Sequence, residues 1–447
     1  MYISNQSFLV LGVSKSGYAV AERILQSGGK CFLYEQLKSE KIEQSIATLS
    51  KMGGVLVNDS QIDELFEKID ALVISPGVPI NHEVAVKAKR KGVRILGELE
   101  FGWASLRPIV VAVTGTNGKT TTCTMIDQIL KEASRKNLLV GNIGEPLTGK
   151  IDEIDYNTVC VTEVSSFQLE SVYSFCPHIS CVLNIAPDHL ERHYSMENYL
   201  FLKKRIFKNQ RESEYCVLNA DDKTVKEFGN ETRAKIIWVS VQDKVKGAYL
   251  ESGSLCYDGE EIIKQKDLAM GGIHNVYNAL FAICVAKLLG VKNQVISHAL
   301  QNMKGVKHRI ELIEKIDGVE YYNDSKATNV SATLSALDCM TKPTILILGG
   351  SEKGETYEAI FEKVKQRPIK HVVLTGASKY AMLDCAGRCG YTDVTVTPDF
   401  EFAVKISNIL AEDGDCVLLS PACASYDFFK SFEERGEKFS QIVRSFY

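Results

Sequence analysis

The clearest chemistry in this sequence lies in Gly115–Thr121, which reads G-T-N-G-K-T-T. This stretch follows the apolar run Ile109–Val113, and the order predicts a buried strand that ends in a glycine-bracketed turn. In such a turn successive backbone N–H groups bind a phosphate, the Lys119 ammonium neutralises it, and the Thr120 hydroxyl can hold Mg²⁺. The stretch therefore predicts a site for a nucleoside triphosphate.

The pattern is the shortened form of a phosphate loop, because the full motif has another glycine where Val113 stands. The alternative reading is a polar strand–helix turn with a surface lysine. We disfavour it because a Lys-Thr pair directly after glycine at a strand end has little structural reason to exist.

The composition indicates a globular enzyme of several domains. The chain has 447 residues, of which 45% are hydrophobic and 24% charged, and this length predicts about two to four domains. The formal net charge is −4, so the protein has no overall positive field and nucleic acid is a poor candidate partner. An anionic substrate must be bound by local loops and a few cations.

The cysteines and the apolar segments indicate a cytoplasmic location. Thirteen cysteines are scattered from Cys31 to Cys423 without a C-x-x-C pair, a distribution typical of reduced, mostly buried thiols. No apolar segment approaches the ~20 residues that cross a bilayer, and Met1 leads almost directly into an apolar strand without a signal-like region. We expect a cytoplasmic protein that contacts no membrane.

The alternation of short apolar runs with helical stretches predicts an α/β fold in three domains, at 1–97, 98–306 and 307–447. Parallel sheets with crossover helices are the natural arrangement for such a pattern. We expect Gly97–Pro108 to be a linker between the first two domains. Residues Ile310–Tyr322 are predicted to form a hairpin whose turn is Asp317-Gly318.

The first predicted domain contains two turns at the carboxyl edge of its sheet, where open α/β sheets bind ligands. The turn Gly12–Gly17 resembles a dinucleotide fingerprint, but Ser14 stands where the second glycine should be, so NAD is disfavoured. The second turn begins at Ser75. A ligand contact and a purely structural role are both open for it.

The second predicted domain has further polar residues at strand ends. Glu163 follows an apolar run and is a candidate Mg²⁺ ligand, although it can also be a helix N-terminal charge. His189 lies in a loop rich in acids and bases, which favours metal or phosphate contact, whereas His193 remains ambiguous. Asn275 and Asn278 share one helix face and can read a purine edge, or Asn275 can be only an N-cap.

The third predicted domain has three polar loops, each after an apolar run. They are Asn323–Asn329, Gly349–Gly354 and Ser420–Ser425. Because the carboxyl ends of parallel strands meet at one edge, we expect these hydroxyls and lysines to share one site.

Together these motifs resemble the Mur ligases, the ATP-dependent amide-forming enzymes of peptidoglycan precursor synthesis. The resemblance covers essentially the whole chain in family order. It runs through Gly115–Thr121, Gly141–Gly144, Glu163–Glu170, Pro187–Arg192, His274–Ala279, His308-Arg309, Asn323–Asn329 and Ser420–Ser425. Within the family, E-V-S-S-F-Q-L-E, N-D-S-K-A-T-N and L-L-S-P-A-C-A-S-Y-D-F-F look like the members that add D-glutamate to UDP-N-acetylmuramoyl-L-alanine.

The resemblance implies a fold and a reaction. The fold comprises a Rossmann-like N-terminal domain for the nucleotide sugar, a central phosphate-loop ATPase-type domain, and a Rossmann-like C-terminal domain for amino acid and ATP. In the reaction, the substrate carboxylate takes the γ-phosphoryl group of ATP, and the amine of D-glutamate attacks the acyl phosphate. The implied partners are these three small molecules, and we expect a monomer.

The resemblance also implies the site residues. ATP is bound by Gly115, Thr116, Asn117, Gly118, Lys119, Thr120, Thr121, Asn275, Asn278, Arg309 and Asp324. Two Mg²⁺ ions are held by Thr120, Glu163, His189 and Lys203. The nucleotide sugar contacts Ser14, Lys15, Glu35, Ser75, Asn142 and His189, and D-glutamate contacts Thr328, Lys353, Ser425 and Phe432. Lys119, Glu163, His189, Lys203 and Lys353 are the implied catalytic residues.

Lys203 matches the family lysine that becomes a carbamate and so an anionic metal ligand. Its neighbour Lys204 is the other candidate, and the K-x-R-I register favours Lys203.

Three other functions compete with this interpretation. One is another Mur ligase or a folylpolyglutamate synthase-like enzyme, although those synthases lack the N-terminal nucleotide-sugar domain. Another is a nucleotide-binding regulator without catalysis, which would be favoured by loss of Lys119, Glu163 or His189, and all three are present. A nicotinamide oxidoreductase is disfavoured by Ser14.

Overall fold

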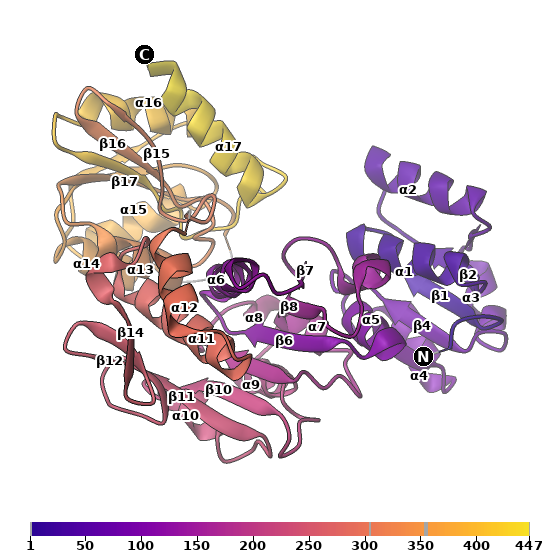
Figure 1. Cartoon of the computed structure of the whole chain (residues 1–447). Coiled ribbons are helices and arrows are strands. Elements are labelled where there is room, and N and C mark those ends of the chain that lie inside the picture. The colour runs from indigo at the N-terminus through magenta and orange to yellow at the C-terminus, as the bar shows by residue number, and fades with distance from the viewer. Residues whose placement is uncertain (1, 304, 353–355, 447) are drawn as a thin grey trace. The chain divides into compact units, whose positions relative to one another are not determined.

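The computed structural model describes residues 2–303, 305–352 and 356–446. Within these ranges the chain forms three β-sheets with helices packed against them, which confirms the predicted α/β class (Figure 1). The chain divides into two compact units, Met1–Leu268 with Val276–Asn302, and Ala269–Asn275 with Met303–Tyr447. The first unit contains two of the sheets. The domain boundaries at 97 and 306 stay a prediction.

The first sheet is parallel, in the order β3-β2-β1-β4-β5. Its strands are β1 (Ser7–Leu11), β2 (Lys30–Tyr34), β3 (Val55–Leu56), β4 (Ala71–Ile74) and β5 (Arg94–Gly97), and its helices are α1 (Lys15–Gln26), α2 (Glu40–Lys51), α3 (Asp59–Leu65) and α4 (Glu83–Arg90). Alternate residues of a strand point to opposite faces. Accordingly Phe8 and Val10 belong to one hydrophobic cluster and Leu9 and Leu11 to another, so both faces of the sheet are covered.

The predicted linker Gly97–Pro108 is wrong. Gly97 ends β5, and the residues that follow form helix α5 (Glu98–Leu106), most of which is buried. Phe101 packs into a cluster of the first sheet, whereas Trp103 packs into the core of the second. Gly97 and Pro108 indicated breaks in secondary structure. The apolar residues between them nevertheless form a helix, because different residues of it are buried in two different cores.

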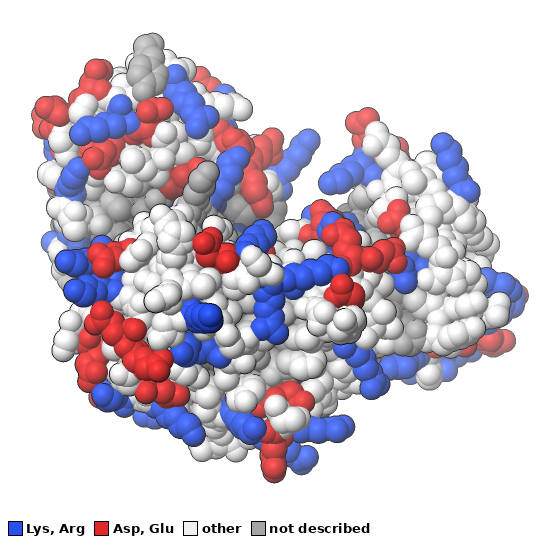
Figure 2. Space-filling model, in the orientation of Figure 1, with Lys and Arg blue, Asp and Glu red and all other residues white. Residues whose placement is uncertain are grey.

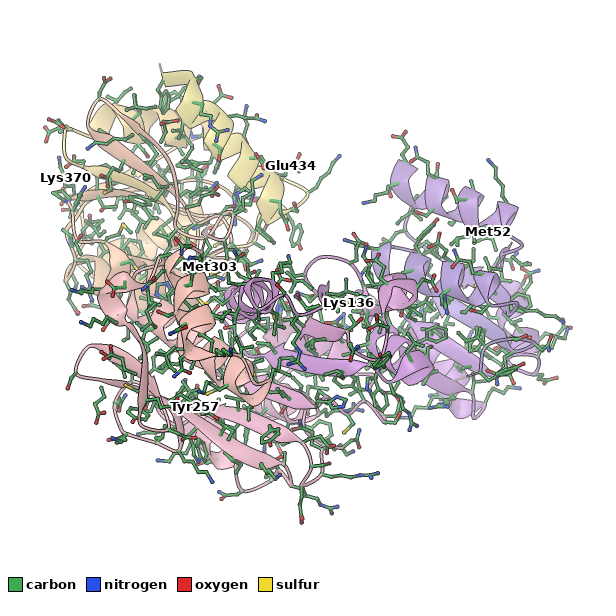
Figure 3. The ribbon with its side chains drawn as sticks, in the orientation of Figure 1. Met52, Lys136, Tyr257, Met303, Lys370 and Glu434 are labelled. Carbon is green, nitrogen blue, oxygen red and sulfur yellow. The ribbon has the colours of Figure 1, made fainter. Side chains whose placement is uncertain are left out.

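The second sheet has the order β14-β13-β12-β11-β10-β9-β6-β8-β7. Its strands are β6 (Ile109–Thr114), β7 (Asn137–Gly141), β8 (Val159–Glu163), β9 (Ile179–Val182), β10 (Tyr215–Asn219), β11 (Lys235–Ser240), β12 (Gly247–Glu251), β13 (Ser254–Tyr257) and β14 (Glu260–Lys264). Pairing is parallel from β7 to β12, and an antiparallel meander completes the edge that Tyr257 marks in Figure 3. The apolar residues of β6 are buried, as expected for a central parallel strand.

Several helices connect these strands. They are α6 (Lys119–Glu132), η1 (Leu147–Glu153), α7 (Ser166–Leu169), α8 (Leu190–His193), α9 (Met196–Lys204), α10 (Lys223–Phe228), η2 (Gln265–Asp267), α11 (Ile273–Leu288) and α12 (Asn293–Gln301).

The third sheet belongs to the second unit and has the order β15-β16-β20-β17-β18-β19. Its strands are β15 (Glu311–Ile316), β16 (Val319–Asn323), β17 (Thr344–Leu348), β18 (Ile369–Leu374), β19 (Val394–Val396) and β20 (Cys416–Leu419), and its helices are α13 (Val330–Cys339), α14 (Glu358–Val364), α15 (Lys379–Arg388), α16 (Phe400–Leu410), α17 (Phe432–Val443) and η3 (Arg444–Phe446). Strands β15 and β16 form the predicted hairpin with its turn at Asp317-Gly318, and the other pairs are parallel.

The cysteines have the state expected from the sequence. All thirteen cysteines lie in the described part of the chain as free thiols, and most are buried. Lys and Arg side chains are interspersed with Asp and Glu side chains over the face shown in Figure 2. Among the described residues, no helix combines the length and the apolar character that crossing a bilayer requires.

Candidate active site

The predicted phosphate loop lies between β6 and α6, at the carboxyl end of a central strand. Its glycines have positive φ angles, 148° at Gly115 and 85° at Gly118, which favour glycine. A Cβ atom on Gly118 would lie 2.4 Å from Oδ1 of Asn278, so a side chain there would force Asn278 to move. Asn184 braces the loop, because its Oδ1 accepts a hydrogen bond from the Asn117 backbone N–H at 2.8 Å and its Nδ2 donates to the Asn117 carbonyl at 3.1 Å.

The Lys119 side chain folds back over the phosphate loop. Lys119 Nζ donates to the carbonyl oxygens of Gly115 and Thr116, at 2.9 and 2.8 Å. Thr121 is fully buried, and Thr122 Oγ1 donates to Asn278 Oδ1 at 3.2 Å. The lysine charge, the loop amides and the Asn278 amide therefore gather at one end of the sheet.

A chain of three polar side chains joins this loop to the neighbouring strands. Thr120 Oγ1 donates to Glu163 Oε2 at 2.8 Å, and Asn142 Nδ2 donates to Glu163 Oε1 at 2.8 Å. Glu163 is the last residue of β8 and is 3% exposed. A hydroxyl and a carboxylate in contact are suitable oxygen ligands for Mg²⁺. The described residues contain no group of three or more His, Cys, Asp or Glu side chains that could hold a metal by themselves.

The two candidate lysines of α9 have different surroundings. Lys203 is 2% exposed, and its Nζ donates to Thr114 Oγ1 at 3.1 Å and to the Gly115 carbonyl at 2.8 Å. Burial lowers the pKa of Lys203 well below its ordinary value, and the nearby Lys119 charge lowers it further. Lys204 forms an ion pair with Glu231 instead. Only Lys203 therefore reaches the phosphate loop.

The loop that precedes α8 contains His189. Its ring lies 3.5 Å from an Asp188 oxygen and 3.6 Å from a Glu191 oxygen, and its centre is 4.7 Å from that of Phe167. His189 is partly exposed and has φ 55°. This position leaves the imidazole at the same carboxyl edge as Glu163.

His193, which the sequence left ambiguous, has a packing role. Its side chain is buried, its Nε2 lies 2.9 Å from Ser166 Oγ, and burial lowers its pKa to about 4. The imidazole is therefore neutral at physiological pH. Its neighbour Arg192 donates to both carboxylate oxygens of Glu170, at 3.0 and 2.6 Å, which anchors the loop.

The predicted nucleotide-sugar residues gather at the carboxyl edge of the first sheet. Glu35 Oε2 accepts from the backbone N–H of Val13 at 2.6 Å, and Ser75 Oγ donates to the Gly12 carbonyl at 2.7 Å. Ser14 is the exposed N-cap residue of α1, and its side chain caps no helix N–H. These contacts show that Glu35 and Ser75 shape the turn, and that Ser14 remains accessible.

Two further contacts connect this edge to the second sheet. Lys15 Nζ donates to the Gly144 carbonyl at 2.6 Å, in the loop that contains Asn142. Arg192 donates to the carbonyls of Gly77 and Val78, at 3.3 and 3.1 Å. The carboxyl edges of the two sheets in the first unit therefore face the same region.

The second unit contains a separate group of predicted residues. Asp324, directly after β16, is 1% exposed, and its Oδ2 accepts from Ser420 Oγ at 2.8 Å. Arg309 lies close enough to lower the Asp324 pKa, and its Nε is buried without a hydrogen-bond partner among the described residues. An unsatisfied guanidinium nitrogen is suited to a phosphate or carboxylate ligand.

The remaining predicted residues of the second unit differ in their burial and in their contacts. Ser425 is buried and Thr328 half-buried, and Lys326 Nζ lies 4.5 Å from the ring centre of Phe432. Asn275 lies in the first turn of α11, where its Nδ2 donates to the Gly271 carbonyl at 2.8 Å. Because α11 begins at Ile273, Asn275 lies inside the helix and is not its N-cap. Lys353 lies outside the described residues.

Arg435 was not identified from the sequence. It is 2% exposed and donates to the carbonyls of Ser325, Cys423 and Ala424, and to Ser325 Oγ, at 2.8 to 3.2 Å. It therefore connects the two polar loops that begin at 323 and 420. An arginine in the charged start of α17 looks like a surface residue, so no sequence signal distinguished it. Asn184 was missed for a similar reason, since its role depends on a loop far away in sequence.

The environment of Asp324 gives a testable pH dependence. Burial raises the pKa of its carboxyl from 3.8 to about 6, although Arg309 and Ser420 oppose the shift. Below both pKa values the carboxyl is protonated in the folded and unfolded states and costs nothing. As the pH rises from 3.8 to about 6, the unfolded chain ionises while the folded carboxyl keeps its proton, so the free energy of unfolding falls by about 2 to 3 kcal/mol and is then constant.

Replacing Asp324 by Asn should therefore stabilise the protein more at pH 7.5 than at pH 4.5, because the amide keeps the shape without the charge. Urea unfolding at the two pH values measures this difference. The exposed Asp413→Asn variant is the control. An equal effect of D324N at both pH values would contradict the buried charge.

The site combines a phosphate loop on a central parallel strand, a hydroxyl–carboxylate pair beside it, and contact with the carboxyl edge of the first sheet. Together these features define a phosphate-binding α/β protein of the nucleotide-using class. Two family descriptions match the chain. They are "Mur ligase middle domain" over residues 113–286 and "Mur ligase, glutamate ligase domain" over residues 308–423. The chain belongs to the Mur ligase family.

Full-length relatives support this assignment. The chain is 38% identical over 450 residues to UDP-N-acetylmuramoylalanine–D-glutamate ligase of Thermoanaerobacter sp. (strain X514), covering 99% of each chain. It is 37% identical to the enzyme of the same name from Clostridioides difficile (strain 630), covering 100% of each. The fold is similar to that of the MurF ligase from Thermotoga maritima, solved in complex with ADP, with a TM-score of 0.61, 17% identity, and coverage of 99% and 96%.

Proposed function

We propose that this protein is an ATP-dependent ligase that joins D-glutamate to UDP-N-acetylmuramoyl-L-alanine during cytoplasmic peptidoglycan precursor synthesis. The observation that carries the proposal is the contact between Thr120 and Glu163 directly beside Lys119. Relatives that bear the name of this activity and align over their whole length support the choice of substrates. ATP use is a property of the Mur ligase family.

The first half-reaction requires two anions to be held together. The substrate carboxylate attacks the γ-phosphorus of ATP, the bond to the β–γ bridging oxygen breaks, and ADP leaves. Lys119 and the loop amides stabilise the charge that spreads over the transferring phosphoryl group. Thr120 and Glu163 would hold one Mg²⁺, which would neutralise phosphate charge. Asn142 and His189 position the muramoyl end of the acceptor.

The second half-reaction forms the amide. The amine of D-glutamate attacks the acyl carbon, phosphate leaves, and one proton is released. Thr328, Lys353, Ser425 and Phe432 are the residues that we propose for D-glutamate. Asn275, Asn278, Arg309 and Asp324 are those that we propose for the base, phosphates and ribose of ATP, beside Gly115–Thr121. Ser14, Lys15, Glu35 and Ser75 are those that we propose for the uridine nucleotide.

Lys203 is proposed to be a carbamate that holds a second Mg²⁺ together with His189. Its burial against the phosphate loop supports the choice of Lys203 over Lys204. A cationic amine there would repel a metal, whereas a carbamate supplies anionic oxygen ligands. We further propose that the enzyme is a monomer that binds neither nucleic acid nor membrane.

A phosphate-release assay tests the proposed function. With ATP, Mg²⁺ and UDP-N-acetylmuramoyl-L-alanine, D-glutamate should support turnover and L-glutamate should not. Turnover with another amino acid or with a folate substrate would instead indicate the alternative ligases. Nucleotide binding with no phosphate release under any condition would indicate a regulator.

A further inference from the structure

A pocket lies at the amino ends of strands of the second sheet, whereas the phosphate loop lies at the carboxyl end of β6. It has a volume of about 570 Å³, within the range of small-molecule sites. His178 and Glu214, which line it, stand immediately before β9 and β10, and Lys136, labelled in Figure 3, marks the same edge before β7. Strand β6 has six residues, so the pocket lies about 20 Å from the phosphate loop.

The wall of the pocket is held by buried hydrogen bonds. Glu100 is fully buried, and its carboxylate accepts from the backbone N–H groups of Tyr173, Ser174 and Phe175, at 2.9 to 3.2 Å. Asn209 Nδ2 donates to the carbonyls of Tyr173 and Phe175, at 2.8 and 3.0 Å. A loop fixed in this way keeps the pocket formed without a ligand.

The pocket presents three cationic or N–H donor side chains, Arg107, His178 and Arg211, and one carboxylate, Glu214. Arg107 forms no ion pair with any described residue, whereas Arg211 and His178 lie close enough to the Glu214 carboxylate to help lower its pKa. His178 Nδ1 lies 3.4 Å from the Val110 backbone N–H and accepts from it, so a neutral His178 ring has its N–H on Nε2. The lining carboxylate, Glu214, accepts from the Arg211 backbone N–H and from Ser213 Oγ, both at 2.6 Å.

Two aromatic rings also line the pocket. The Arg107 guanidinium carbon lies 5.6 Å from the ring centre of Trp103, and the half-exposed Tyr173 ring lines the same pocket. Trp103 is 7% exposed, and its indole N–H has no hydrogen-bond partner among the described residues, which is unusual for a buried tryptophan. Guanidinium groups beside aromatic rings are suited to a flat anion, because they stack on its ring and donate in pairs to its carboxylate.

We propose that this pocket is an accessory binding site for a small aromatic carboxylate. The arginines bind the carboxylate, and Trp103 and Tyr173 pack against the ring. The site is independent of the ligase reaction, and its existence does not depend on the proposed function. The net charge of −4 means that such an anion is attracted by these local cations and not by the protein as a whole.

Binding of 3-(trifluoromethyl)benzoate to the full-length protein tests the proposal through fluorine NMR line broadening. The neutral 3-(trifluoromethyl)benzamide, which has the same shape, should bind at least tenfold more weakly. In a Trp238→Phe protein Trp103 is the remaining tryptophan, and its emission should change as the benzoate is added. ATP with Mg²⁺ should not displace the probe.

The double variant R107Q/R211Q should weaken benzoate binding at least tenfold. The matched control R90Q/R94Q removes two exposed arginines of the first sheet region and should leave binding unchanged. Equal binding of acid and amide, unchanged binding in R107Q/R211Q, or displacement by ATP would each overturn the proposal. Absence of benzoate binding at millimolar concentration, with an unchanged circular dichroism spectrum, would overturn it as well.

Discussion

Replacing Lys119 by alanine is expected to lower kcat at least about 10³-fold while the protein stays folded. Lys119 Nζ lies over the phosphate loop, where it donates to the carbonyls of Gly115 and Thr116. The variant removes the cation that stabilises the transferring phosphoryl group. Because these two bonds are to carbonyls within the loop itself, their loss should change stability much less than activity.

Phosphate release and a thermal unfolding curve measure the two effects separately. Lys131→Ala is the control, because Lys131 lies on the same helix α6 and forms an ion pair with Asp127 one turn away, at 2.8 Å. It should retain activity. Near-normal kcat of Lys119→Ala with a native unfolding curve would refute the phosphate-loop assignment.

Replacing Lys203 by alanine should lower kcat at least about 10²-fold, and added acetate should restore part of the activity. The expected rescue follows from the proposed carbamate, since a free carboxylate can occupy the place of the lost anionic ligand. Lys204→Ala, which removes an ion pair with Glu231, should cost no more than ~0.5 kcal/mol of stability and need no rescue.

A different result is expected if Lys203 functions as an unmodified amine. Lys203 Nζ donates to Thr114 Oγ1 and the Gly115 carbonyl, so an uncarbamylated lysine could act as a structural anchor of the loop. Rescue by methylammonium but not by acetate would favour that role. Full activity of Lys203→Ala without any additive would refute both the carbamate and the two-metal proposal.

The sequence by itself determined the α/β class, the phosphate loop and the hairpin at Asp317-Gly318. Each depends on short-range properties of the chain. A run such as Ile109–Val113 is apolar enough to be a buried strand wherever it is placed, and positive φ angles at Gly115 and Gly118 require glycine locally. The family resemblance could be recognised for the same reason, because its motifs are contiguous stretches.

Tertiary structure decided the features that depend on partners distant in sequence. Residues 98–106 became the helix α5 because Phe101 and Trp103 are buried in two different cores. Lys203 and Lys204 are chemically alike, and only the packing of α9 buries the first against the phosphate loop and leaves the second to pair with Glu231. Burial and long-range hydrogen bonding depend on which segments meet, and local periodicity carries little of that information.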